Sequence, residues 1–264
     1  GEEGDGARSL KTVAAYTGGG DKLNMCYTFD LLGPQFAPAH FAGCIEDFEA
    51  AVTDGWVCWA FSNHDVNRHV SRWTPPGADT ARVAKLAAAL IVSLRGSICV
   101  YQGEELGLLE ADIAFEDLQD PYGIRFWPGY KGRDGCRTPM PWEAGRRNAG
   151  FSSAARTWLP VPPAHERAAV SVQRRDPHSV LSAYKAMIAF RAAQPALRAG
   201  EVKVLHADEA VLVLARTAGE ERVLCVFNLS TKPARWTVPQ DQGKPALLDA
   251  PDFGASLRGR TLSL

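Results

Sequence analysis

A dense group of polar side chains follows an apolar run in the first quarter of the chain. The run at residues 56–61 leads directly into His64 and Asp65, and Arg68 and Arg72 follow within the next seven residues. An imidazole beside a carboxylate can bind hydroxyl groups and exchange protons, and a guanidinium can orient the carboxylate. Aromatic residues crowd the same segment, namely Trp56, Trp59, Phe61 and Trp73. This mixture suits sugars, which offer apolar faces and hydroxyl edges, although a helix start capped by Asp65 with solvated arginines gives the same pattern.

A second polar group follows another apolar run. Residues 97–101 (SICVY) lead into Gln102, Gly103, Glu104 and Glu105. In parallel α/β folds the carboxyl ends of the strands lie on one edge, where active sites are built. We therefore expect this group and the one that contains Asp65 to lie on the same edge of a sheet, and we expect Glu104 and Glu105 to position loops rather than to act in catalysis.

Apolar runs alternate with helical periodicity in the first part of the chain. Near-continuous apolar runs occupy residues 23–29, 56–61 and 97–101, and apolar residues at helical spacing occupy 41–52 and 83–94. Such runs are typical of strands buried on both faces, and helices between them indicate a parallel sheet. The fold class is therefore α/β.

Two segments that differ in composition and periodicity follow. Residues 103–178 are rich in Gly, Pro and Trp and have little periodicity, which is typical of a long functional loop. After Pro195 come short runs of strand character separated by turns. We predict that residues 1–197 form the α/β part, including the long loop, and that residues 198–264 form a small antiparallel β domain.

Composition excludes several classes of protein. The 264 residues carry 29 Lys and Arg against 30 Asp and Glu, and 46% are hydrophobic, which argues against a disordered chain and against nucleic-acid binding by bulk charge. The longest apolar stretch, residues 86–94, is far shorter than the roughly 20 residues of a membrane-spanning helix. The six cysteines form no CxxC pair and lie near no His at metal-ligand spacing, so we expect free thiols in a reducing compartment, no metal centre and no cofactor.

Three long motifs stand in order along the chain. They are residues 61–65 (FSNHD) with Arg68 and Arg72, residues 101–107 (YQGEELG) and residues 132–142 (GRDGCRTPMPW). The first two resemble a conserved region and the end of the eighth barrel strand of glycoside hydrolase family 13, the α-amylase superfamily. The third resembles a loop typical of its α-glucosidase and oligo-1,6-glucosidase branch.

The resemblance implies a (β/α)₈ barrel with an inserted domain and a C-terminal β domain. It implies retaining hydrolysis of α-glucosidic bonds in small substrates such as malto- or isomalto-oligosaccharides. By this resemblance, the chain is the C-terminal part of the barrel, strands six to eight with their helices, followed by the β domain. The first five strands and the inserted domain are expected to precede Gly1 in a longer protein.

The resemblance also assigns residues. Asp65 matches the third carboxylate of the family, which holds sugar hydroxyls and favours distortion of the ring, and His64 matches a histidine that hydrogen-bonds the same sugar. Arg68 is expected to orient Asp65 or to reach the substrate. Arg137 and the turn that ends at Trp142 are expected to line the substrate entrance, with a rigid structural loop as the alternative.

The resemblance gives two candidates for the acid/base and none for the nucleophile. Glu2 fits the proton donor of the Gly-Glu motif at the end of the fifth strand, and Glu3 is the second candidate because the strand that would fix the register is missing. The Gly-x-Arg-x-Asp motif of the nucleophile does not occur, and Asp134 in Gly-Arg-Asp-Gly is expected to serve a turn instead. We therefore expect the chain to be inactive by itself.

Two other functions stay open. A transglycosylating relative that forms sucrose- or trehalose-type products would use the same residues, because a sugar hydroxyl can replace water. A non-catalytic relative is disfavoured by the presence of His64, Asp65 and Glu2. The linkage preferred, α-1,4 or α-1,6, is not decided, and the cysteines favour the cytoplasm unless a segment before Gly1 carries an export signal.

Overall fold

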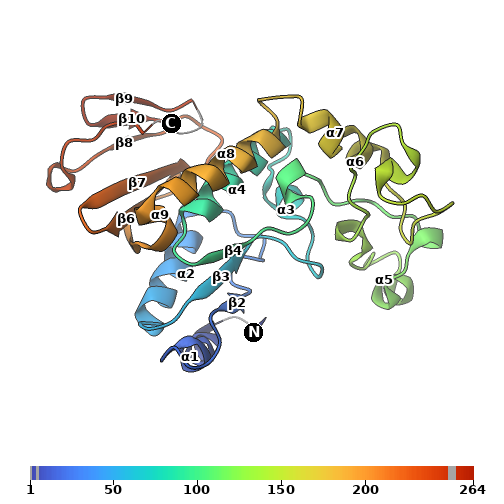
Figure 1. Ribbon diagram of the computed structural model, residues 1–264, viewed down its shortest axis with the longest axis horizontal. Coiled ribbons are helices and arrows are strands. Elements are labelled where there is room, and N and C mark those ends of the chain that lie inside the picture. The colour runs from blue at the N-terminus through green and yellow to red at the C-terminus, as the bar shows by residue number, and fades with distance from the viewer. Residues whose placement is uncertain (1, 4–5, 249–253) are drawn as a thin grey trace. The chain divides into compact units, whose positions relative to one another are not determined.

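The structure is a computed structural model that describes residues 2–3, 6–248 and 254–264, with side chains from Ser9 onward (Figure 1). The chain divides into two compact units. The first comprises Gly1–Trp59, Ala89–Ile98 and Ala186–Leu264, and the second comprises Ala60–Ala88 and Cys99–Lys185.

A four-stranded sheet is built from the first hundred residues in the order β1-β2-β3-β4. Its strands are β1 (Glu2–Glu3), β2 (Cys26–Thr28), β3 (Val57–Ala60) and β4 (Ser97–Cys99). β1 pairs with β2, and β2 with β3, in parallel. The three expected strands are present but shorter than their apolar runs, and no apolar run marks the edge strand β1.

Long helices connect and cover these strands. They are α1 (Gly6–Thr17), α2 (Pro38–Ala51), α4 (Thr80–Ser93) and α8 (Val180–Ala193). Pro38 stands in the first turn of α2, where its missing N–H costs no helix hydrogen bond. Asp79 caps α4 by accepting the backbone N–H of Ala81 at 2.9 Å. The helical periodicity of the sequence therefore gave the positions of α2 and α4 correctly.

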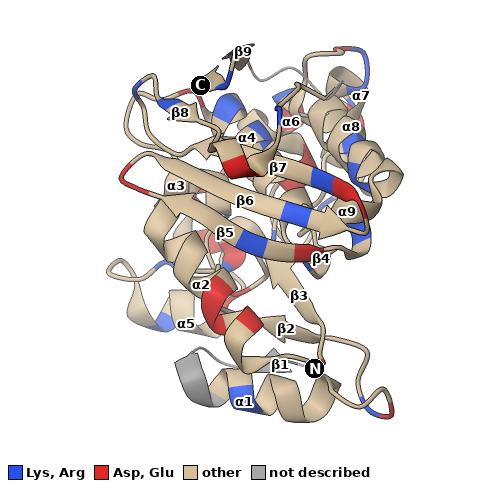
Figure 2. Cartoon of the chain, turned by 90° about the vertical axis from the view of Figure 1, so that its left-hand side faces the viewer, with Lys and Arg blue, Asp and Glu red and all other residues tan. Residues whose placement is uncertain are grey.

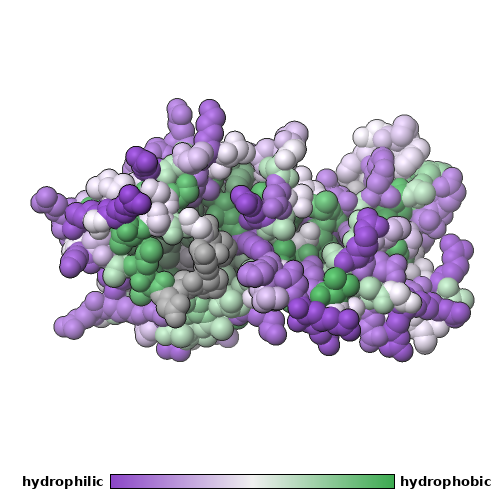
Figure 3. Space-filling view, turned by 90° about the horizontal axis from the view of Figure 1, so that it is seen from above, coloured by the Kyte–Doolittle hydropathy of each residue, from purple (hydrophilic) through white to green (hydrophobic). Residues whose placement is uncertain are grey.

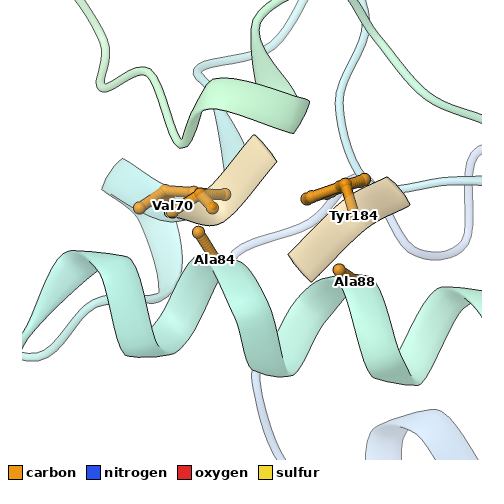
Figure 4. Close-up of a cluster of buried hydrophobic side chains, with 5 residues drawn as sticks. Val70, Ala84, Ala88 and Tyr184 are labelled. Atoms are coloured by element: carbon orange, nitrogen blue, oxygen red, sulfur yellow. The ribbon is translucent and has the colours of Figure 1, made fainter. Parts of the chain in front are cut away.

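The short helix α3 (His69–Trp73) and the beginning of α8 pack on an alanine face of α4. Figure 4 shows Val70 of α3 beside Ala84, and Tyr184 of α8 beside Ala88. The small alanine side chains let larger groups approach the helix closely, so the segment that follows β3 is fixed against a rigid helix.

The long segment between β4 and α8 is ordered by short helices and two apolar clusters. The helices are η1 (Glu104–Leu106), η2 (Phe115–Asp117), α5 (Pro121–Phe126), η3 (Asp134–Cys136), η4 (Arg147–Gly150), α6 (Pro163–Arg167) and α7 (Val170–Gln173). The clusters contain Leu106, Leu108, Met140 and Val170, and Ile113, Leu118 and Leu159. The expected lack of periodicity therefore reflects many short elements rather than a structureless loop.

The C-terminal part begins after α9 (Pro195–Ala199) and consists of two antiparallel three-stranded sheets. The first holds β5 (Glu201–Ala207), β6 (Val211–Ala218) and β7 (Glu221–Asn228), which lie side by side in Figure 2. The second holds β8 (Arg235–Thr237), β10 (Thr261–Ser263) and β9 (Ser256–Arg258), in that order, with η5 (Gln240–Gln242) after β8. Strands β9 and β10 were not predicted.

The surface shows no continuous apolar belt on the face drawn in Figure 3, where hydrophobic and hydrophilic residues are interleaved. Among the described residues, no helix combines the length and the apolar character that crossing a membrane requires.

Arg216 on β6 is a buried cation that joins three segments of the first unit. Its Nη1 donates to the carbonyl oxygen of Ser93 at 2.7 Å, its Nη2 to that of Gly200 at 2.8 Å, and its Nε to that of Glu201 at 3.1 Å. Burial is the main cause that lowers the pKa of Arg216 to about 10, so the guanidinium stays charged at neutral pH. Hydrogen bonds from this cation satisfy carbonyls at the end of α4 and the beginning of β5.

We expect Arg216→Met to lower the free energy of unfolding by about 3 kcal/mol, because three carbonyls lose a charged donor. Urea denaturation followed by circular dichroism measures this change. The matched control is Arg222→Met at an exposed position of the neighbouring β7, where a change below about 0.5 kcal/mol is expected. Equal losses in the two variants would contradict the role of Arg216.

Candidate active site

The loop that follows β3 presents His64 and Asp65 to solvent. Asn63 shapes this loop, because its Oδ1 accepts the backbone N–H groups of Asp65 at 2.8 Å and Val66 at 3.2 Å. This side-chain turn replaces a backbone turn and fixes the direction of the two following residues. The side chains of His64 and Asp65 are 62% and 45% exposed, so both are available to a ligand.

Three basic side chains surround the Asp65 carboxylate. Its Oδ1 accepts from Arg133 Nη1 at 2.7 Å and from Arg137 Nη2 at 3.1 Å, and its Oδ2 lies 3.4 Å from His64 Nε2. Arg137 Nε also donates to the carbonyl oxygen of His64 at 2.7 Å. The structure therefore brings together three of the residues selected from the sequence, His64, Asp65 and Arg137.

Arg133 was not predicted as a site residue, although it lies in the motif of residues 132–142. Its own position is set by Asp120, whose fully buried Oδ2 accepts from Arg133 Nε at 2.9 Å and from the Arg133 backbone N–H at 2.8 Å. The hydrogen bond from Arg133 is the main cause that lowers the pKa of Asp120 to about 2. Asp120 therefore stays ionised and holds Arg133 with one guanidinium nitrogen directed at Asp65.

Asp134 orders the backbone around Asp120 from a buried position. It is buried, and its Oδ2 accepts the backbone N–H groups of Gln119 at 2.6 Å and Asp120 at 2.7 Å. The carboxylate is thus used by the backbone of a segment 14 to 15 residues earlier in the chain, rather than by a turn at its own position. Asp120 itself had no signal, because it stands in a stretch without periodicity.

Arg68 has a role different from the expected one. Its side chain is buried, and Nη1 donates to the carbonyl oxygen of Gln102 at 2.7 Å while Nη2 donates to that of Cys136 at 2.9 Å. The hydrogen bonds of this guanidinium go to loop carbonyls and not to Asp65 or to the exposed surface. The expectation that Arg68 orients Asp65 or reaches the substrate is corrected: Arg68 holds two loops in place.

Gly103 is required by this arrangement. It has a φ of +88°, which L side chains rarely adopt, and a Cβ there would lie 2.7 Å from Arg68 Nη1 and 2.7 Å from Leu108 Cδ1. A larger residue would push the guanidinium away from the Gln102 carbonyl. Gly103 therefore permits the close approach of the loop after β4 to Arg68.

A buried contact between a histidine and a glutamate connects the same two loops. His69 Nδ1 lies 3.2 Å from Glu104 Oε1, and both side chains are almost fully buried. Ser62 Oγ lies 3.1 Å from His69 Nδ1 and accepts the His69 backbone N–H at 2.8 Å. Glu105 differs from Glu104, because its Oε2 accepts the Gly103 N–H at 2.8 Å and burial raises the pKa of its carboxyl group.

A pocket of about 670 Å³ adjoins His64 and Arg137. Besides these two residues, its polar lining includes Gln102 and Glu105, and its aromatic lining consists of Tyr101, Trp142, Phe151 and Trp158. Hydrophobic walls with a few polar groups are typical of small-molecule sites of this size. Arg137 and Trp142 line this pocket, and their expected place at a substrate entrance stays a prediction.

The remaining residues considered from the sequence are Glu2, Glu3 and the cysteines. Glu2 belongs to β1, but its side chain, like that of Glu3, lies outside the described residues, so its role stays a prediction. The six cysteines are free thiols. Within the described ranges, no group of three or more His, Cys, Asp or Glu side chains is arranged to hold a metal ion.

His165 fastens the loop that carries Arg137. Its Nδ1 lies 3.1 Å from Thr138 Oγ1 and its Nε2 lies 2.8 Å from the Leu109 carbonyl oxygen, so the ring fits as the neutral tautomer that donates from Nε2. Burial is the main cause that lowers the pKa of His165 to about 4.

The unfolding free energy is expected to depend on pH through His165. Its folded pKa of about 4 lies below the unfolded value of about 6.5, so its contribution is complete above pH 6.5, declines as the pH falls and is lost near pH 4. The loss amounts to about 3 kcal/mol. Urea denaturation of the wild type and His165→Gln between pH 7 and pH 4 should show the difference between them shrinking by this amount. A constant difference would contradict the buried neutral imidazole.

Comparisons with known proteins identify the family of this chain. The sequence profile of the α-amylase catalytic domain matches residues 23–200, and that of the maltogenic amylase C-terminal domain matches residues 202–248. The "Probable alpha-glucosidase" of Rhizobium meliloti (strain 1021) is 50% identical over 246 residues, which cover 93% of this chain and 44% of that protein. The oligo-1,6-glucosidase of Heyndrickxia coagulans is 30% identical over 273 residues, covering 89% of this chain and 48% of the relative.

Solved structures of enzymes share the fold of this chain over nearly its whole length. The α-glucosyl transfer enzyme XgtA superposes with a TM-score of 0.91 at 46% identity, covering 100% of this chain and 48% of its own. The trehalulose synthase MutB of Pseudomonas mesoacidophila MX-45 superposes with a TM-score of 0.82 at 26% identity, covering 97% and 52%. The chain spans about half the length of the relatives it matches. On the match over residues 23–200, this chain belongs to the α-amylase family of glycoside hydrolases.

Proposed function

We propose that this chain is the C-terminal part of a retaining α-glucosidase that acts on short α-linked glucosides. In this proposal β2, β3 and β4 are strands six to eight of a (β/α)₈ barrel, β1 is the end of strand five, and residues 198–264 are the C-terminal domain. The parallel pairing of β1 with β2 and of β2 with β3, with α2 before β3 and α4 before β4, supports this assignment.

The proposal depends on the Asp65 carboxylate, which accepts hydrogen bonds from Arg133 and Arg137 and lies close to His64. Two of these neighbours, His64 and Arg137, line the pocket. The hydrogen bonds from the two arginines orient the carboxylate. An ionised carboxylate can accept hydrogen bonds from two sugar hydroxyls and favours the positive charge that develops on an oxocarbenium-like ring. Trp142 and Tyr101 line the pocket and offer apolar faces to a sugar ring.

The complete reaction needs two more carboxyl groups. In a retaining hydrolase one carboxylate attacks the anomeric carbon while the other protonates the departing oxygen, and water then releases the sugar from the covalent intermediate. We assign proton transfer to Glu2, with Glu3 as the second candidate. The Gly-x-Arg-x-Asp segment of the nucleophile does not occur in these 264 residues, so the proposal places it in the remainder of a longer protein.

A transglycosylating enzyme is the second candidate. It is favoured by the likeness to the α-glucosyl transfer enzyme XgtA over the whole of this chain. The same intermediate would then pass its glucosyl group to a sugar hydroxyl instead of water. The six free cysteines support a place for the protein in the cytoplasm.

We expect Asp65→Asn, introduced into the full-length enzyme, to lower kcat by about a hundredfold or more, because the neutral amide cannot stabilise the developing charge. The melting temperature should change little, since the side chain is half exposed and exposed ion pairs contribute little to stability. Hydrolysis of 4-nitrophenyl α-glucoside and calorimetry measure the two effects. Asp112→Asn, at an exposed carboxylate paired with Lys131, is the matched control and should retain full activity. Near-normal turnover by Asp65→Asn would refute the assignment.

The 264-residue chain alone is expected not to hydrolyse 4-nitrophenyl α-glucoside, because the nucleophile motif is absent and its strand edges are open. The purified chain and the full-length enzyme are assayed at equal concentration, and light scattering reports the aggregation expected of the chain alone. Robust turnover by the chain would show that the account of the missing nucleophile is wrong.

A further inference from the structure

The loop that carries His64 and Asp65 is closed at its base by buried side chains. The backbone N–H of His69 donates to Ser62 Oγ at 2.8 Å, so the two ends of the loop meet. Ser62 is the second residue after β3, and His69 is the first residue of α3. The next residue of α3 packs on the alanine face of α4 (Figure 4), so the far end of the loop is fixed to a long helix.

Glu104 attaches the base of this loop to the segment after β4. His69 Nδ1 lies 3.2 Å from Glu104 Oε1, and the two side chains are 0% and 2% exposed. Glu104 belongs to η1 and stands in the chain between Gln102 and Glu105, which both line the pocket of about 670 Å³. One buried contact therefore joins the loop after β3 to the loop that forms a wall of the pocket.

This contact needs a proton between its two atoms, because a bare imidazole nitrogen and a carboxylate oxygen repel each other at such a distance. His69 Nε2 is buried and has no hydrogen-bond partner among the described residues, so the proton of a neutral ring belongs on Nδ1. Nδ1–H then donates to the Glu104 carboxylate. The rings of Phe61 and Trp73 lie 5.9 Å and 5.3 Å from the imidazole, and a hydrogen bond to a charged group is strong in such apolar surroundings.

The arginines and the buried contact act on different parts of the same loop. Arg133 and Arg137 hold the side chain of Asp65 by hydrogen bonds to its Oδ1. The contact between His69 and Glu104 holds the backbone that leads to this side chain. A carboxylate that stabilises developing charge has to stay in place during the reaction, and a displacement of about 1 Å can lower a rate about a hundredfold.

We propose that Ser62, His69 and Glu104 are positioning residues of the reaction. The hydrogen bond from His69 Nδ1 to Glu104, with Ser62 closing the loop, holds the backbone of Asp65 where its carboxylate meets the substrate. The three buried side chains touch no substrate and act through Asp65. The inference rests on the proposed α-glucosidase function and deepens it, since it ascribes part of the rate to a buried contact outside the lining of the pocket.

The test introduces Glu104→Leu, Glu104→Gln and Ser62→Ala into the full-length enzyme. Leu fills most of the space of Glu104 but accepts no hydrogen bond, whereas Gln keeps an oxygen that accepts from Nδ1–H. Arg216→Met is the matched control, because Arg216 is also buried but belongs to the first unit and not to the loop of Asp65. The melting temperature verifies that each variant is folded.

We expect Glu104→Leu to lower kcat for 4-nitrophenyl α-glucoside about tenfold and to change KM by less than about threefold, because the loss falls mainly on the transition state. Glu104→Gln should stay within about threefold of the wild-type kcat, and Ser62→Ala should lower kcat about threefold, as for one neutral hydrogen bond. Arg216→Met should retain the wild-type kcat. Wild-type kcat in both Glu104→Leu and Ser62→Ala would overturn the proposal.

A double-mutant cycle with Asp65→Asn separates positioning from a merely structural role. If Glu104 acts through Asp65, Glu104→Leu lowers the kcat of the Asp65→Asn enzyme by less than about twofold, because the carboxylate that it positions is gone. A full further loss of about tenfold would contradict the proposal. Should Glu104→Leu not fold, the cycle is made with Ser62→Ala, where a full further loss of about threefold is the contradicting result.

Hydrogen exchange separates this inference from the proposed function. If the wild-type enzyme hydrolyses no α-glucoside, the proposed function fails, and the cluster is then judged by exchange of the backbone amides of residues 63–67, followed by mass spectrometry. Exchange that is about tenfold faster in Glu104→Leu or Ser62→Ala, and unchanged in Arg216→Met, would support the role of the cluster in holding this loop. Unchanged exchange in both cluster variants would overturn it.

Discussion

The candidate site depends on one buried cation. Arg68 carries its charge into the interior of the second unit and donates to the carbonyl oxygens of Gln102 and Cys136, and among the described side chains no ion pair with a carboxylate is seen for its guanidinium. Burial lowers its pKa, an effect opposed by nearby groups that include Glu110 and Glu104. A buried charge is costly unless it is hydrogen-bonded, so the two loops are held where they satisfy it. Gly103 is a glycine because no Cβ fits beside this guanidinium.

The fixed loops allow charge to be arranged around Asp65 before any ligand arrives. Asp134 orders the backbone at Asp120, Asp120 holds Arg133, and Arg133 reaches Asp65. Each partner in this series constrains the next, so the exposed carboxylate has a defined direction. Preorganised charge of this kind stabilises a transition state without reorganisation during the reaction. In the proposed function the exposed carboxylate of this series contacts the sugar, and the buried members hold it in place.

Much of this arrangement could be predicted, and the reasons for success and failure are physical. Buried parallel strands and amphipathic helices leave strong local patterns, so β3, α2 and α4 were found from the sequence. The two- and three-residue strands β1, β9 and β10 leave no such pattern.

The candidate site likewise contains residues that the sequence could predict and residues that it could not. His64 and Asp65 could be selected because they adjoin a buried strand, and Arg137 because it stands in a recognisable motif, and the structure brings the three together. Asp120 was missed because its importance arises from a contact with Arg133, 13 residues away in an irregular loop. The role of Arg68 was wrong, because an arginine three residues after an aspartate gives no sign that Gly103 and Cys136, far along the chain, enclose it.

The central claim is that these residues serve a retaining α-glucosidase. Its most direct test is the anomeric configuration of the glucose first released from an α-glucoside by the full-length enzyme, followed by proton NMR before mutarotation. Double displacement predicts that α-glucose appears first and that the β-anomer grows only later. Initial release of β-glucose would mean a single displacement by water, and would contradict the double displacement proposed for Glu2 and the nucleophile of the longer protein.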